Sequence, residues 1–121
     1  MRTFEEWMGD YLKFRERAGK MLSQNIPSEP GQLQQQSQEL EPLRWEAEEH
    51  RAFAESYYYR AKAETADKLV QGGYPRSSAY EAAKAKSHRQ LWARENTKGL
   101  CKVIDSRGMK IAQHLKLMDG R

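Results

Sequence analysis

Apolar and aromatic residues near the start of the chain recur every three or four positions, the spacing of one face of an α-helix. This face comprises Phe4, Trp7, Met8, Tyr11, Leu12, Arg15, Ala18 and Leu22. Thr3 is a suitable N-cap, and Glu5 and Glu6 would oppose the helix dipole in the first turn. The pattern predicts an N-terminal amphipathic helix over residues 1–22.

The periodic pattern stops over residues 23–37. Pro27, Pro30 and Gly31 disfavour a helix interior, and the run of glutamines offers little to bury. We therefore expect a flexible Pro/Gln-rich linker over 23–37, which leaves the first helix able to dock on its own chain or on a neighbouring subunit.

A second helix is predicted over about residues 38–70. Its apolar positions alternate in steps of three and four, which is the heptad seam of a coiled coil. The seam consists of Leu40, Leu43, Ala47, His50, Ala54, Tyr57 and Ala61. Gly72 and Gly73, followed by Pro75, favour a left-handed cap and a stop.

A third helix is predicted from Ser78, where Glu81 completes a capping box, to about Met118. Its apolar seam is also the expected oligomer interface. It comprises Leu100, Ile104, Gly108, Ile111, Leu115 and Met118. Because the turn before this helix is short, residues 38–121 are expected to form a long antiparallel helical hairpin. No segment has a strand pattern, so the predicted fold class is all-α.

Charge divides the chain into an acidic and a basic part. Residues 71–121 carry eleven Lys or Arg and four acids, a net charge of +7, whereas residues 23–70 carry five basic and nine acidic residues, a net charge of −4. Hydrophobic residues make up only 38% of the 121 positions and charged residues 31%. A core this limited favours completion by oligomerisation, and the asymmetry favours a polyanionic partner and self-association between unlike surfaces.

The basic residues of the last helix suggest a phosphate-binding stripe. Arg94, Lys98 and Lys102 are four residues apart and share one helix face. Further candidates precede them, namely Lys84, Lys86 and Arg89. Tyr58, Tyr59 and Tyr74 are candidates for base stacking, because single-stranded nucleic acid is commonly held by aromatic side chains beside a basic groove. The alternative for any single helix is an ordinary solvated charged face.

Catalytic and metal-binding motifs are not evident. His50, His88, His114 and Cys101 lack partners at ligand spacing, and no Gly-rich phosphate loop or nucleophile motif occurs. We therefore expect no enzymatic activity, no cofactor and no metal. A single cysteine fits a reducing compartment, and no apolar run approaches a membrane span, so a cytoplasmic location without membrane contact is expected.

The C-terminal stretch 101–121, CKVIDSRGMKIAQHLKLMDGR, resembles the last helix of the UvsY-like recombination mediators of tailed phages. The matching positions are Ile104, Ser106, Arg107, Gly108, Ile111 and Met118. A second match is a tyrosine pair within Tyr57-Tyr58-Tyr59. A third is Tyr80-Glu81, near the start of the last predicted helix. Together the similar features cover about residues 45–121. The family's basic residues before the tyrosine pair are replaced here by Phe53, Ala54, Glu55 and Ser56.

The resemblance implies a non-enzymatic oligomeric ring that binds single-stranded DNA. It further implies two partners in the cytoplasm of the host cell. One is a RecA-like recombinase that the protein helps to load, and the other is a single-strand-binding protein that is displaced.

The alternative is a phage structural or assembly protein whose basic and acidic halves dock subunits together. A third possibility is a small regulator that binds a host protein through the N-terminal helix. Arg107 could bind phosphate or form an intersubunit ion pair with an acid of the second helix.

Overall fold

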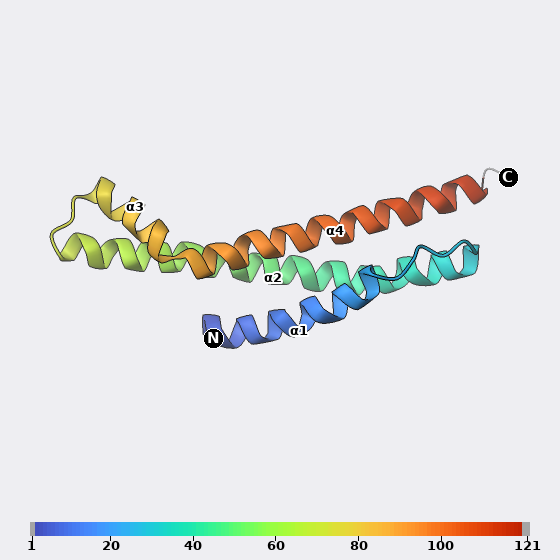
Figure 1. Ribbon diagram of the computed structural model, residues 1–121, viewed down its shortest axis with the longest axis horizontal. Coiled ribbons are helices and arrows are strands. Elements are labelled where there is room, and N and C mark those ends of the chain that lie inside the picture. The colour runs from blue at the N-terminus through green and yellow to red at the C-terminus, as the bar shows by residue number, and fades with distance from the viewer. Residues whose placement is uncertain (1, 120–121) are drawn as a thin grey trace. The chain divides into compact units, whose positions relative to one another are not determined.

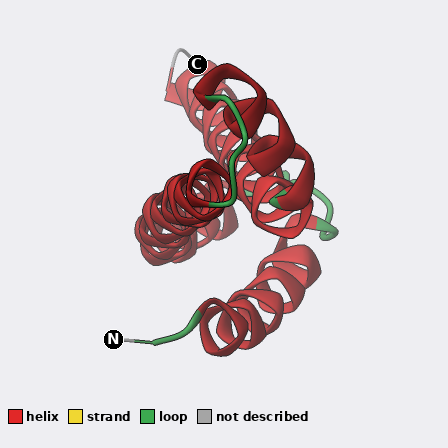
Figure 2. Ribbon diagram, turned by 90° about the vertical axis from the view of Figure 1, so that its left-hand side faces the viewer, coloured by secondary structure: helices red, strands yellow, loops and turns green. Residues whose placement is uncertain are grey.

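The computed structural model describes residues 2–119, which form four α-helices and no strand (Figure 1). The helices are α1 (Phe4–Leu22), α2 (Pro30–Gln71), α3 (Arg76–Lys86) and α4 (His88–Asp119). The all-α class is therefore confirmed (Figure 2). The predicted segments 1–22 and 38–121 also contain residues 1, 120 and 121, which lie outside the described residues.

The helices are distributed over two compact units. Unit 1 contains the chain up to Glu49 and again from Gly99 onward, and unit 2 contains His50–Lys98. Unit 1 thus combines α1 with the first part of α2 and most of α4, and unit 2 combines the rest of α2 with α3 and the start of α4.

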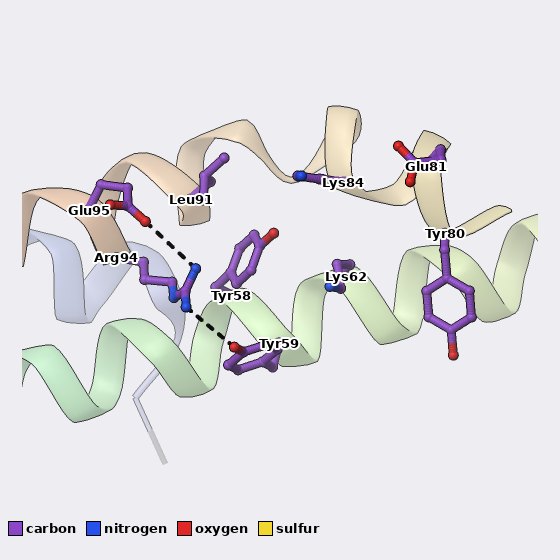
Figure 3. Close-up of a pocket in the computed structure, with 9 residues that line it drawn as sticks. All are labelled: Tyr58, Tyr59, Lys62, Tyr80, Glu81, Lys84, Leu91, Arg94 and Glu95. Carbon is purple, nitrogen blue, oxygen red and sulfur yellow. Dashed lines mark hydrogen bonds and ion pairs between the residues drawn. The ribbon is translucent and has the colours of Figure 1, made fainter. Parts of the chain in front are cut away.

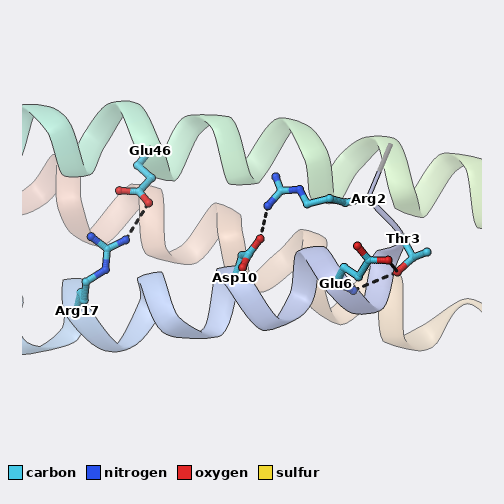
Figure 4. Close-up of polar contacts among 6 residues, drawn as sticks. All are labelled: Arg2, Thr3, Glu6, Asp10, Arg17 and Glu46. Atoms are coloured by element: carbon cyan, nitrogen blue, oxygen red, sulfur yellow. Dashed lines mark hydrogen bonds and ion pairs between the residues drawn. The ribbon is translucent and has the colours of Figure 1, made fainter.

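Helix α1 begins at the predicted cap and buries one aromatic face. The Thr3 hydroxyl accepts a hydrogen bond from the Glu6 backbone N–H at 3.2 Å (Figure 4). Burial is complete for Trp7, Tyr11, Phe14 and Ala18. The prediction was wrong at Leu12, which is 45% exposed, while Phe14 turns inward. The buried positions follow steps of four, three and four, so the inner face is narrower than the predicted one.

Unit 1 is held by apolar packing with polar contacts at its surface. Its core joins the α1 face to Leu33, Leu40 and Ala47 of α2 and to Cys101, Ile104 and Ile111 of α4. Arg17 bridges α1 to Glu46 at 2.9 Å (Figure 4), and Arg44 bridges α2 to Asp105 of α4 at 3.2 Å. These ion pairs are exposed, so each contributes at most about 1 kcal/mol, and the apolar core supplies most of the stability.

The predicted linker over 23–37 was too long, because α2 begins at Pro30 rather than at residue 38. Proline is tolerated in the first turn of a helix, where its missing N–H would have no partner anyway. Leu33 and Gln36 then face inward and are buried. The connection between α1 and α2 is therefore confined to residues 23–29.

The turn after α2 has the predicted left-handed glycine. Gly73 has a φ of 99°, and the Tyr74 N–H donates to the Leu69 carbonyl at 3.0 Å. The Gly73 N–H donates to the Val70 carbonyl at 3.1 Å, which completes a Schellman cap. Glycine adopts this conformation without the clash that a Cβ would cause.

The predicted single helix over 78–118 is two helices. α3 begins at Arg76 after Pro75, so Ser78 lies inside the helix and the predicted Ser78–Glu81 capping box does not form. α3 ends where Ser87 leaves helical geometry at φ −100° and ψ 27°, and the buried Ser87 carbonyl accepts from the Leu91 N–H at 2.9 Å. The break follows Ala79 and Ala83, whose small side chains are completely buried.

Within residues 2–119, no helix is both long enough and apolar enough to cross a lipid bilayer.

Gly73→Ala should lower the free energy of unfolding by about 1 kcal/mol, because alanine is strained at positive φ. The matched control is Gly9→Ala inside α1, where an added Cβ would have no atom within 4 Å. That change should raise stability by up to about 1 kcal/mol through helix propensity. Urea denaturation of the two variants would measure both changes in the free energy of unfolding. If the two changes had the same sign, the left-handed conformation of Gly73 would not account for its effect.

Burial raises the pKa of the Tyr11 hydroxyl from 10.0 to about 12. The unfolded chain therefore loses this proton first as the pH rises, so the stabilisation is complete below pH 10.0 and is lost as the pH approaches about 12. Tyr11→Phe removes the titrating group, so this variant should lose less stability between these pH values than the unchanged protein. Urea denaturation across the range measures the difference. Parallel stability curves for the two proteins would refute the effect.

Candidate nucleic-acid interface

Unit 2 contains a hollow of about 510 Å³ that combines aromatic and basic side chains (Figure 3). Residues from α2, α3 and α4 line it. They are Tyr58, Tyr59, Lys62, Tyr80, Glu81, Lys84, Leu91, Arg94 and Glu95. Three tyrosines and three cations therefore share one surface with two carboxylates.

Arg94 lies at the centre of this arrangement, and its side chain is only 21% exposed. Its guanidinium lies 5.3 Å from the Tyr58 ring centroid and 5.5 Å from that of Tyr59, and its Nη2 donates to the Tyr59 hydroxyl at 3.4 Å. Its Nε lies 3.5 Å from Glu55, and its Nη1 lies 3.6 Å from Glu95. Arg94 is thus held between two rings and two carboxylates, which partly compensate its charge.

Lys62 supplies a second cation to the same tyrosine pair. Its Nζ lies 5.5 Å from the Tyr58 ring centroid and 5.6 Å from that of Tyr59. The electron-rich ring faces attract such cations. The two rings are tilted by 58° at a centroid distance of 5.4 Å. Tyr59 remains 49% exposed and Tyr80 58% exposed, so two aromatic rings are accessible beside the cations.

The structure brings only part of the predicted site together. Arg94, Lys84 and Tyr59 line the hollow, whereas Lys86, Arg89, Lys98 and Tyr74 do not. Lys102 belongs to unit 1, so the predicted stripe is divided between the units. Tyr58 lines the hollow but is only 3% exposed, which contradicts its prediction as a solvent-facing stacking platform. Its ring is covered because α2 turns this side of its tyrosine run toward α4.

Sequence reasoning missed Lys62 and Tyr80. Lys62 follows Tyr58 by four residues and Tyr59 by three, and these spacings bring helical side chains together. Tyr80 precedes Lys84 by four residues in α3. The same rule applied to aromatic–cation pairs would have found both residues.

Part of the predicted oligomer interface belongs to the core of the single chain. Ile104 and Ile111 are only 2% and 1% exposed, so neither is available to a second subunit. The other predicted interface positions are partly exposed, namely Leu100, Gly108, Leu115 and Met118. Arg107 also turns inward: its Nε donates to the Gln36 side-chain oxygen at 3.0 Å, and its Nη2 donates to the Gln24 carbonyl.

Among the described residues, no group of three or more His, Cys, Asp or Glu side chains is placed to hold a metal ion. The helices and the hollow of unit 2 together define an all-α protein with an aromatic and basic surface site. Comparison with known protein families, with curated proteins and with solved structures finds no match to this chain.

Arg94→Met should destabilise unit 2 by about 1–2 kcal/mol, because it removes the contacts to both rings and leaves Glu55 and Glu95 without their shared cation. Urea denaturation measures the loss. A second change, Glu95→Gln, should recover part of it by removing one carboxylate. If Arg94→Met leaves stability unchanged, Arg94 does not organise the hollow.

Proposed function

We propose that this protein binds single-stranded DNA without strong sequence preference and without catalysis, through the hollow of unit 2. The observation that supports this most directly is the placement of Lys62, Lys84 and Arg94 around the exposed rings of Tyr59 and Tyr80. Aromatic platforms beside cations are the common means of holding single strands, because every base can stack and every nucleotide carries a phosphate.

The contacts suggest a division of roles within the hollow. Arg94 is engaged with Glu55 and Glu95, so its main role is to position Tyr58 and Tyr59. Lys62 and Lys84 are then the principal phosphate contacts, and Tyr59 and Tyr80 are the stacking surfaces. With about two phosphates engaged, the logarithm of the binding constant should fall with a slope of about −1.4 against the logarithm of salt concentration.

The same surface favours a single strand over a duplex. Bases in a duplex are stacked on each other and are not presented to a protein side chain, whereas those of a single strand can unstack onto tyrosine. Glu81 and Glu95 line the hollow too, and their charge opposes a dense array of phosphates. A flexible strand can place its phosphates away from these carboxylates more easily than a stiff duplex can.

The wider proposal is a recombination or replication mediator that helps to load a RecA-like recombinase in exchange for single-strand-binding protein. Its support is the resemblance of the α4 sequence around Ser106-Arg107-Gly108 to the UvsY-like mediators. An antiparallel helical hairpin that assembles into a homo-oligomer belongs to the same proposal. The second candidate is a phage structural or assembly protein, which is favoured by the exposure of Trp45, a large apolar side chain that DNA binding does not explain.

The test is binding of fluorescent oligo-dT, and of a matched duplex, across a salt series. We expect strand-selective binding that weakens with salt. A Lys62→Gln, Lys84→Gln variant should bind at least about tenfold more weakly, since both principal phosphate contacts are lost. The matched control is Lys13→Gln, Lys20→Gln, which removes the same charge from exposed positions of α1.

Two outcomes would contradict separate parts of the proposal. Absence of binding at low salt would refute the function itself. Binding that survives in the Lys62→Gln, Lys84→Gln variant but is lost in a Lys86→Gln, Lys98→Gln variant would refute the hollow and favour the basic residues predicted from sequence.

A further inference from the structure

Trp45 is the most exposed large apolar side chain among the described residues, at 74%. It lies on α2 in unit 1, where a hollow of about 340 Å³ is lined by Glu41, Arg44, Trp45 and Glu48. Arg44 is paired with Asp105 at 3.2 Å, so its charge is largely compensated. The remaining surface, Glu41, Trp45 and Glu48, is an apolar residue between two exposed carboxylates, and we call it the acidic face.

A second hollow of unit 1, of about 280 Å³, has the opposite charge. It is lined by Leu22, Lys102, Val103, Ser106, Arg107 and Lys110. Val103 is 52% exposed, and Lys102 and Lys110 are exposed as well. Arg107 is turned inward by its bonds to Gln36 and Gln24. We call Lys102, Val103 and Lys110, with Leu22 beside them, the basic face.

We propose that the acidic face of one copy of this protein docks on the basic face of a second copy. Glu41 and Glu48 are seven residues apart on α2, and Lys102 and Lys110 are eight apart on α4. The two carboxylates and the two ammonium groups are therefore each separated by about two helical turns, about 11–12 Å, so that each carboxylate can face one lysine. Trp45 lies between its two carboxylates and enters the hollow beside Leu22 and Val103. An aromatic anchor supplies affinity at such a contact, and the paired charges select its orientation.

The two faces point in different directions. At about 100° per residue, Lys102, Val103 and Lys110 fall on one side of α4, and Asp105, Gly108 and Ala112 fall on nearly the opposite side. The latter three residues line a third hollow that shares Glu41 and Arg44 with the hollow around Trp45. Docking therefore joins unlike surfaces and leaves one face of each kind accessible on every pair. Such contacts continue into a closed ring or an open chain.

The decisive experiment reverses the charge of each face in the full-length protein. The acidic-face variant is Glu41→Lys, Glu48→Lys, and the basic-face variant is Lys102→Glu, Lys110→Glu. The unchanged protein should exceed its monomer mass of 14.1 kDa in sedimentation at low salt and dissociate as salt rises. Each variant alone should remain monomeric, because both of its faces then carry the same charge.

Mixing the two variants should restore assembly, because the reversed faces complement each other again. The control for charge is Glu64→Lys, Asp67→Lys, which makes the same change at exposed positions of α2 in unit 2 and should assemble normally. Trp45→Ala should weaken association at least about tenfold while leaving the circular dichroism unchanged, because this side chain is exposed.

The proposal is overturned if the unchanged protein is monomeric at every concentration and salt. It is also overturned if either charge-reversal variant assembles alone, or if the mixture stays monomeric while both variants are folded. The mixture would also stay monomeric if the true partner of the acidic face were a basic segment of another protein, and that outcome would replace self-docking. No DNA is present in these measurements, so their outcome is separate from that of strand binding.

Discussion

The aromatic row on α1 is the contact on which unit 1 depends. Trp7 stacks on Tyr11 with ring centroids 5.3 Å apart and planes 5° from parallel, and Phe14 continues the row. The core of unit 2 combines the buried tyrosines Tyr57 and Tyr58 with alanines of α2, α3 and α4. Small side chains let helices approach closely but bury little area. Unit 2 therefore gains a larger share of its stability from the contacts of Arg94 and Lys62 with the tyrosine pair.

That difference explains why the candidate site lies in unit 2. The large side chains Tyr59, Tyr80 and Trp92 lie at its surface. Arg94 is fixed among rings and carboxylates and so holds its neighbours in place. A rigid aromatic surface loses little conformational entropy when a base stacks on it. The site is thus a consequence of the packing that stabilises the unit.

Local signals predicted local structure well. Thr3 caps α1 and Gly73 closes the turn after α2, since each acts through its own backbone and side chain. Boundaries that depend on partners were missed. Pro30 starts α2 because Leu33 and Gln36 find buried positions, and the helix breaks at Ser87, a residue without a strong stop signal. The inward turn of Phe14 in place of Leu12 likewise depends on the helices opposite α1.

The candidate site was predicted in part for the same reason. Basic residues four apart in sequence were visible as a stripe, but the acids that compensate a given cation were not. Glu55 lies far from Arg94 in sequence and only 3.5 Å from it in space. In the same way Asp105 compensates Arg44. A net charge of +7 over the last part of the chain therefore overstates the field at any one point, and the cations that remain available are those without a carboxylate opposite them.

The two proposed surfaces would reinforce each other. One hollow that engages about two phosphates binds weakly, because each phosphate contributes a modest electrostatic gain that physiological salt reduces. Copies joined through Trp45 would present several such hollows to one strand. Each further contact would then form at high effective concentration, so avidity would exceed the affinity of a single hollow without any new kind of interaction. On this argument the acidic α2 surface matters for strand binding although it repels DNA, because its partner is the basic face of the next copy.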